Sequence, residues 1–266
     1  MKKLLLASDP ELFTRTSCGK LSSVAGKLGC DKYNKIDLGS IRLQEDNVLV
    51  EFDIDPSDNF AGFNALIKRG IAESEKAIKP HGLEIAKNIC SHIYTTEELN
   101  SFDPSAFVFG CEPDFNGLTG MKNPRPVAVD AGLRSAGGHI HFGFDDKVSV
   151  GGMEQMAMTI MCDFFLGLPS VLLDNDTRRR ELYGKAGSIR YKPYGIEYRT
   201  LSNFWIFSDK GRKWAWDQGN KAYNFIKDIN DARMLASMVS PDEVQRVINQ
   251  DDKVMAEQYI KLMEIM

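Results

Sequence analysis

The sequence predicts an α+β protein in which an antiparallel sheet carries helices on one face. Segments with strand-like patterning fill much of the first 200 residues, and amphipathic helical segments fill the end of the chain. No Pro/Ser-rich linker, low-complexity tract or repeat divides the 266 residues, so a single domain over 1–266 is expected, with a helical tail at about 208–266.

Alternating polarity predicts the strands. In one predicted strand, Val50 and Phe52 alternate with Glu51 and Asp53, which places the acids on one face. The region 17–46 is rich in Gly and Lys and is expected to be irregular. Its Gly26-Lys27 lacks both the glycine spacing and the Ser/Thr of a phosphate loop, so that motif is rejected. The predicted strands are 3–13, 47–54, 106–111, 138–144, 188–192 and 196–201.

Capping residues and helical spacing predict the helices. Asp58 is the expected N-cap of a helix that ends at Pro80, and a second helix is expected over 149–168. Ser208 is expected to cap a helix over 209–229, and Ser240-Pro241 starts the last helices.

Composition favours a soluble protein of a reducing compartment. Five scattered cysteines without a C-x-x-C pair argue against a disulfide framework or a zinc knuckle. The net charge of −4 does not indicate a protein that binds nucleic acid through its overall charge. The N-terminal apolar run ends at Ser8-Asp9, too early for a secretory signal, and no stretch is expected to approach the apolar length needed to cross a bilayer. The cytoplasm is therefore the predicted location.

Acids recur inside apolar, strand-like segments, and His139 and His141 project from one face of another. A single acid in a strand usually lies on its solvated face, and a His-x-His pair alone is unspecific. Repetition changes the balance, because two carboxylates about 5 Å apart repel by roughly 3 kcal/mol unless cations compensate. Oxygen-rich ligands favour magnesium or manganese. The acids are Asp9, Glu11, Glu51, Glu112, Asp114 and Glu197.

Arginines complement these acids. The run Arg178–Arg180 is expected near a helix end, where cations complement the helix dipole. Predicted strands with apolar and aromatic neighbours contain Arg190, Glu197 and Arg199, and the two-residue spacing places Glu197 and Arg199 on one face. An acid able to hold metal beside a guanidinium able to grip phosphate indicates phosphoryl transfer from a nucleotide.

Several motifs together resemble one known family. They are S-D-P-E-L-F, Q-E-D-N-V-L-V-E-F, G-C-E-P-D-F-N, G-G-H-I-H-F-G and R-R-R-E-L-Y-G-K-A-G-S-I-R-Y-K-P-Y-G-I-E-Y-R-T-L-S-N-F-W. In this combination and order, from about residue 5 to 206, the chain resembles the phage-encoded carboxylate–amine ligase family, type 2. That family is similar to glutamate–cysteine ligases and, more distantly, to glutamine synthetase.

The resemblance implies a glutamine-synthetase-like catalytic domain with a curved antiparallel sheet. It implies an amidoligase that uses ATP and Mg (or Mn) to form an amide bond through an acyl-phosphate, with Glu197 and Arg199 as catalytic residues. The implied metal ligands are Asp9, Glu11, Glu51, Glu112, His139 and Glu197. The implied nucleotide-binding residues are Arg178, Arg180, Arg190 and Arg199, and Asp114 and His141 would face the substrates. The substrates would be small-molecule or peptide carboxylates and amines, in the host cytoplasm if the protein is phage-encoded.

Alternatives stay open at the level of sequence. The same fold could serve a guanidino-kinase-like phosphotransferase, or a ligase acting on a protein or on a modified base of a nucleic acid. A non-enzymatic nucleic-acid-binding module would use Arg178 to Arg199 as a basic patch, with stacking by Tyr183, Tyr191, Tyr194 and Tyr198. A degenerate scaffold without catalysis is a further alternative, and a homo-oligomer is left open.

Overall fold

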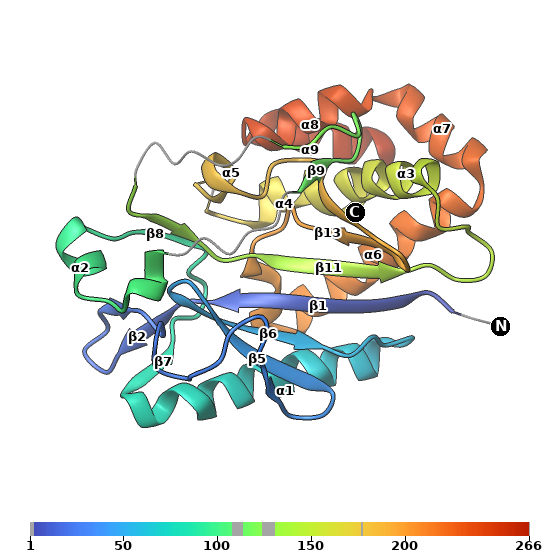
Figure 1. Ribbon diagram of the computed structural model, residues 1–266. Helices are drawn as coiled ribbons and strands as arrows, with labels where there is room; N and C mark the ends of the chain where they lie inside the picture. Colours follow the sequence, from blue (N-terminus) through green and yellow to red (C-terminus); the bar gives the residue numbers. More distant parts are fainter. Residues whose placement is uncertain (1–2, 108–113, 124–130, 177, 266) are drawn as a thin grey trace.

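A computed structural model describes residues 3–107, 114–123, 131–176 and 178–265. An eight-stranded antiparallel sheet runs through its centre (Figure 1), and the predicted α+β class with an antiparallel sheet is confirmed. Its strands, in spatial order, are β4 (Ile36–Asp37), β5 (Ile41–Asp46), β6 (Leu49–Ile54), β1 (Leu5–Leu12), β11 (Gly138–Gly143), β13 (Gly195–Tyr198), β12 (Ser188–Lys192) and β9 (Phe115–Asn116).

The register brings early and late parts of the chain together. Strand β1 pairs with β6 on one side, where Glu11 lies opposite Glu51. On its other side it pairs with β11, where Asp9 lies opposite His139. Strand β13 then places Glu197 opposite His141. The acids and imidazoles that the sequence singled out therefore lie on neighbouring strands.

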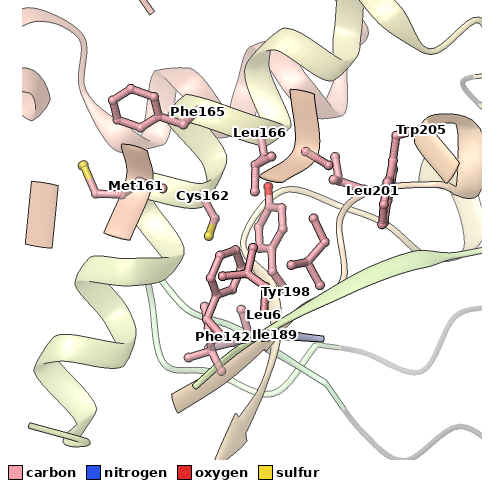
Figure 2. Packing of buried hydrophobic residues seen from close by; sticks show 14 of the residues in the cluster. Leu6, Phe142, Met161, Cys162, Phe165, Leu166, Ile189, Tyr198, Leu201 and Trp205 are labelled. Atoms are coloured by element: carbon pink, nitrogen blue, oxygen red, sulfur yellow. The ribbon is translucent and has the colours of Figure 1, made fainter. Parts of the chain in front are cut away.

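The two faces of the sheet differ in chemistry because side chains alternate along each strand. Apolar residues such as Leu6, Phe52 and Phe142 are fully buried in the main core. Figure 2 shows Phe142 and Tyr198 of the sheet in one cluster with Cys162 of the helix behind it. The residues next to them line a cavity on the opposite face, and among these Glu51, Asp53 and His141 are ionisable. Among the described residues, the long helices pack on the apolar face, and the charged face is left accessible to a ligand.

Helix α1 (Phe60–Ile78) packs on β5 and β6, and Phe63 and Ile67 form its buried stripe. Its N-cap is Asn59, whose side chain accepts a hydrogen bond from Gly62 N at 2.9 Å. The predicted cap, Asp58, instead pairs with Lys3 at the surface, so that prediction was wrong by one residue.

A long helical segment, α3 (Gly152–Cys162), the π-helical turn η3 (Asp163–Gly167) and α4 (Leu168–Leu173), packs behind β12 and β13. By length and composition it could cross a membrane, so the expectation that no stretch reaches that length was wrong. Most of it is buried inside the protein, as in a core helix: 72% of its most apolar window is covered.

The C-terminal part is helical, as its capping residues predict. Ser208 caps α6 by accepting from Gly211 N at 2.9 Å, and Ser240 caps α8 by accepting from Glu243 N at 3.3 Å. Tyr223 of α6 packs on Phe144 after β11, so this region shares the main core with the sheet. The helices are α6 (Asp209–Lys227), α7 (Ile229–Met238), α8 (Pro241–Asn249) and α9 (Lys253–Met263).

Two other predictions need correction. The region 17–46 is not wholly irregular, because β5 crosses its end and builds one side of the cavity. The predicted strand 106–111 begins in a 3-10 helix, Pro104–Phe107, and 108–113 lies outside the described residues. The run Arg178–Arg180, expected near the end of a helix, opens a helix of only four residues, α5 (Arg179–Leu182), so Arg179 and Arg180 lie in its first and its last turn alike.

The remaining elements form smaller units beside the main sheet. They are β2 (Thr14–Thr16), β3 (Leu21–Ser22), η1 (Lys79–His81), β7 (Leu83–Ile85), β8 (Ser91–Ile93), α2 (Thr96–Asn100), β10 (Leu133–Ser135) and η4 (Asn203–Phe207).

Candidate active site

A cavity of about 960 Å³ opens on the charged face of the sheet, and Ser105 of the 3-10 helix Pro104–Phe107 also lines it. Its walls come from β1, β5, β6, β11, β12 and β13, together with a loop at 30–35. Two groups of possible cation ligands lie inside it, and in each group the ligand atoms lie within 4.8 Å of one another. We name Asp9, His141 and Glu197 the histidine cluster, and Glu11, Asp46 and Glu51 the carboxylate cluster.

Asp9 is the centre of the histidine cluster. Its Oδ1 lies 3.2 Å from His139 Nδ1 and 3.2 Å from His141 Nε2. Neither contact has the directional geometry of a hydrogen bond, and this buried oxygen has no hydrogen-bond partner among the residues that the structure describes. Burial raises the pKa of Asp9, but the two imidazoles outweigh it and hold the pKa well below its usual range. A charged oxygen without a hydrogen bond is the arrangement expected of a cation ligand.

The two imidazoles differ in their surroundings although they lie two residues apart. His139 is 2% exposed and lies between Arg179 and Arg199, each with a guanidinium nitrogen 3.3 Å from a ring nitrogen. Burial and the charge of Arg199 lower the pKa of His139. For His141, burial also opposes protonation, but Asp9 and Glu197 outweigh it and raise the pKa. His141 therefore faces the acids, and His139 backs onto arginine.

Glu197 is surrounded by cations. Its Oε1 accepts from Arg199 and lies 3.1 Å from Arg190 Nη1, and its Oε2 lies 2.8 Å from Lys192 Nζ. Burial and Asp9 raise the pKa of Glu197, yet Arg199, His141 and Arg190 more than offset them and lower it to about 2. The side chain is 1% exposed, so this charge is buried with its partners.

The carboxylate cluster has no such compensation from its hydrogen bonds. Glu11 accepts from Gly137 N at 2.5 Å, and Glu51 accepts from the uncharged amide of Gln44 at 2.8 Å. Burial, followed by the charge of Glu11, raises the pKa of Asp46 to about 7 against the attraction of Arg199 and Arg190. Burial and the neighbouring acids Asp46, Asp9 and Glu11 likewise raise the pKa of Glu51 well above its usual value. A divalent cation would relieve this repulsion.

Most of the predicted site residues meet in this cavity. Asp9, Glu11, Glu51, His139, His141, Arg190, Glu197 and Arg199 all line it. His141, expected to face the substrates, belongs to a possible cation site. His139, an expected metal ligand, belongs to neither group and lies between Asp9 and Arg179. Period-two spacing placed both on one face, but it could not show which ring would meet Glu197.

Arg178 and Arg180 do not line the cavity, so the structure does not bring them together with the other predicted site residues. The Arg178 side chain is exposed outside it. The Arg180 guanidinium donates to Asp251 at 2.9 Å and to Ser170 at 3.3 Å, so it joins the C-terminal region to α4. Arg179, between them, supports the site from behind by donating to the Arg199 carbonyl at 3.0 Å.

The predicted site residues near 112–114 have mixed outcomes. Glu112 lies outside the described residues. Asp114 lies next to the site, with Oδ2 3.9 Å from Arg199 Nε, and it accepts from Asn123 at 3.1 Å. Asp114 does not line the cavity, and it is connected to the site through its contact with Arg199.

Sequence reasoning missed Asp46 and Lys192. Asp46 ends β5 at a tight hairpin, and it was placed in an irregular region because β5 was not recognised. Lys192 follows Arg190 by two residues on β12, so the same spacing that grouped Glu197 with Arg199 could have found it.

The chemistry of the donor set fits magnesium. The two clusters offer five carboxylates and one imidazole, and Asp9 Oδ1 is buried with no hydrogen bond from any described residue. Hard, oxygen-preferring cations match such a set, while structural zinc sites are richer in sulfur and nitrogen.

No curated protein matches the chain. Among solved structures, one described as "Crystal structure of novel glutamine synthase homolog" is similar at 12% identity with a TM-score of 0.37. That similarity covers 98% of this chain, and this chain spans 66% of that one.

One sequence segment that a family model recognises contains His139, His141, Arg190, Glu197 and Arg199. Residues 131–216, about a third of the chain, match the family described as Phage phiEco32-like COOH.NH2 ligase-type 2, which confirms the resemblance over this segment.

Proposed function

We propose that this protein is an ATP- and magnesium-dependent carboxylate–amine ligase of the type that the matched family name describes. The observation that carries the proposal is the cavity in which two groups of possible cation ligands lie beside Arg190, Lys192 and Arg199. Phosphoryl transfer from a nucleotide needs both partners, namely acids that hold metal and cations that neutralise phosphate.

The proposed metal ligands are Asp9, His141 and Glu197 at one position and Glu11, Asp46 and Glu51 at the other. When bound, magnesium would polarise phosphoryl oxygens and neutralise their charge, a contribution of several kcal/mol in a preorganised site. Five carboxylates on one face of the sheet would repel one another. Bound cations would offset this repulsion, which explains how the sheet tolerates so much negative charge there.

The cations at β12 and β13 would bind the phosphates. Arg199 is 7% exposed, so its guanidinium is preorganised in a site of low dielectric, where a charged contact is stronger than in water. In the proposed reaction, the substrate carboxylate attacks the γ-phosphorus of ATP and ADP leaves. Arg199 stabilises the charge that develops on the transferred phosphoryl group.

The amine would then attack the carbonyl carbon of the acyl-phosphate. The C–N bond forms, phosphate leaves with the C–O electron pair, and a carboxylate of the cavity accepts the proton of the amine. Water must stay out, because it would hydrolyse the acyl-phosphate. We propose that this takes place in the cytoplasm, with the whole chain acting as one glutamine-synthetase-like domain.

The nucleic-acid-binding alternative finds little support in the geometry. Tyr198 is fully buried and donates to Asp163 at 2.7 Å, so it offers no surface for stacking. Arg180 is held by Asp251, and Arg190 by Glu197, within the protein. A continuous patch of exposed cations and aromatic rings is therefore not formed by this set.

The test is ADP release from ATP and Mg²⁺, measured with a panel of carboxylates paired with amino acids, polyamines and modified nucleosides. Release that requires both a carboxylate and an amine supports the ligase. A stable phosphorylated acceptor without an amide would instead indicate a phosphotransferase. Arg199→Gln should abolish turnover, while Arg178→Gln, outside the cavity, should retain it. Tight, salt-dependent nucleic-acid binding without affinity for ATP would contradict the proposal.

A further inference from the structure

The hairpin between β12 and β13 carries two tyrosines with different surroundings. Tyr191 and Tyr194 are almost equally exposed, at 37% and 38%. Tyr191 packs its ring on Phe115, with centroids 5.3 Å apart, and does not line the cavity. Tyr194 lines the cavity, and its hydroxyl lies 2.7 Å from His141 Nδ1.

The contact with Tyr194 leaves the other imidazole nitrogen facing the acids. His141 Nε2 points to Asp9 at 3.2 Å, in the same cluster as Glu197. A histidine that binds a metal through one nitrogen carries its proton on the other, which then donates to an oxygen. The Tyr194 hydroxyl oxygen is placed to accept that hydrogen bond.

The hairpin itself is held in place from three sides. Gln155 of α3 is buried and donates to the carbonyls of Lys192 at 3.0 Å and Gly195 at 2.7 Å. The Tyr194 carbonyl accepts from Phe144 N at 2.8 Å. Gly195 has φ +148°, and a Cβ there would lie 2.0 Å from the Phe142 carbonyl oxygen. The turn therefore lies so close to β11 that only glycine fits.

We propose that Tyr194 is a positioning residue for the metal site: it fixes the ring and tautomer of His141 so that Nε2 serves the histidine cluster. This inference rests on the proposed metal site. It gives the hairpin the task of orienting the His141 ring, which neither the acids nor the arginines perform. Loss of such a supporting hydrogen bond typically weakens metal binding by about 10–100-fold.

The experiment measures Mn²⁺ affinity of the full chain by electron paramagnetic resonance, without nucleotide or substrate. Tyr194→Phe removes only the hydroxyl and should weaken one class of Mn²⁺ site by at least about tenfold. Tyr191→Phe, the matched control on the same hairpin, should bind Mn²⁺ as the wild type does. A His141→Ala background should erase the difference between Tyr and Phe at 194, because the positioned ring is gone.

A second readout follows the tautomer directly. In ¹⁵N NMR spectra with Mg²⁺, His141 of the wild type should show a protonated Nδ1, and Tyr194→Phe should show a mixture of tautomers. Equal Mn²⁺ affinity and unchanged tautomer in Tyr194→Phe would overturn the positioning role alone. Absence of Mn²⁺ binding by the wild type would overturn the proposed metal site and the positioning role with it.

Discussion

The two clusters of the cavity lie on neighbouring strands and contain similar acids, but their electrostatic surroundings are opposite. Glu197 in the histidine cluster contacts three cationic side chains, which lower its pKa to about 2. In the carboxylate cluster, burial and mutual repulsion raise the pKa of Asp46 to about 7. Among the described residues, direct ion pairs with cations offset the charge of Glu197, whereas burial and repulsion outweigh the attraction of Arg199 and Arg190 for Asp46.

This difference indicates a division of labour. A cation at the carboxylate cluster meets acids that it relieves of repulsion, so metal binding there also stabilises the fold. A cation at the histidine cluster competes with Arg190, Lys192 and Arg199 for Glu197. Phosphate would resolve that competition, because it offers those three side chains another anionic partner.

The largest expected effect is on turnover. Glu197→Gln removes the charge that holds three cations and a proposed metal. Because such a site supplies several kcal/mol, ATP consumption should fall by about a hundredfold or more. The measurement is ADP release under saturating Mg²⁺, with Mg²⁺-dependent ATP affinity measured by calorimetry. Unchanged ATP affinity would assign Glu197 a purely structural role.

The next effect concerns stability and should have opposite signs in the two clusters. In the presence of a chelator, Glu51→Gln should raise the free energy of unfolding, because it removes a repelled charge and retains an amide near Gln44. Glu197→Gln should lower it by about 2 kcal/mol, because it leaves buried cations without their partner. Urea unfolding of both variants tests this, and shifts of the same sign would break the comparison.

The third effect is a dependence of stability on pH. The pKa of Asp46 is raised on folding to about 7, so the stability it contributes is present at acidic pH and lost as the pH rises through that value. With a chelator, the free energy of unfolding should fall by on the order of 1 kcal/mol between pH 6 and pH 8. Asp46→Asn should flatten this trend. Mg²⁺ should oppose it, because the metal binds the deprotonated acids.

The smallest effect separates cations of the site from cations of the scaffold. Arg180→Gln should lower the free energy of unfolding by about 1 kcal/mol, because its ion pair with Asp251 is lost. Arg178→Gln should change it by less than about 0.5 kcal/mol, as for an exposed residue. Neither should alter the KM for ATP. A large rise in KM for either variant would support its predicted contact with nucleotide.

Local patterns were enough to predict much of the fold. Alternating residues in β6, β11 and β13 identified both the strands and their charged faces, because the period of a strand is two residues. Ser208 and Ser240 marked helix starts, because a side-chain oxygen there satisfies a free backbone N–H. Asp58 failed as a cap because the adjacent Asn59 competes for the same role. Strand β5 was missed, and with it Asp46, because it was grouped with the Gly- and Lys-rich region 17–46, although Ile41 to Gln44 alternate in polarity.

The site shows the same boundary between local and tertiary information. The sequence by itself determined which residue types carry the proposed chemistry and that Glu197 and Arg199 share a face, since both follow from composition and spacing. Only the tertiary structure decided that His141, and not His139, joins Asp9 and Glu197. It also decided that Arg180 serves the scaffold and that Tyr194 meets His141. These outcomes depend on the pairing of strands and the packing of helices far apart in the chain, and no local pattern encodes such distances.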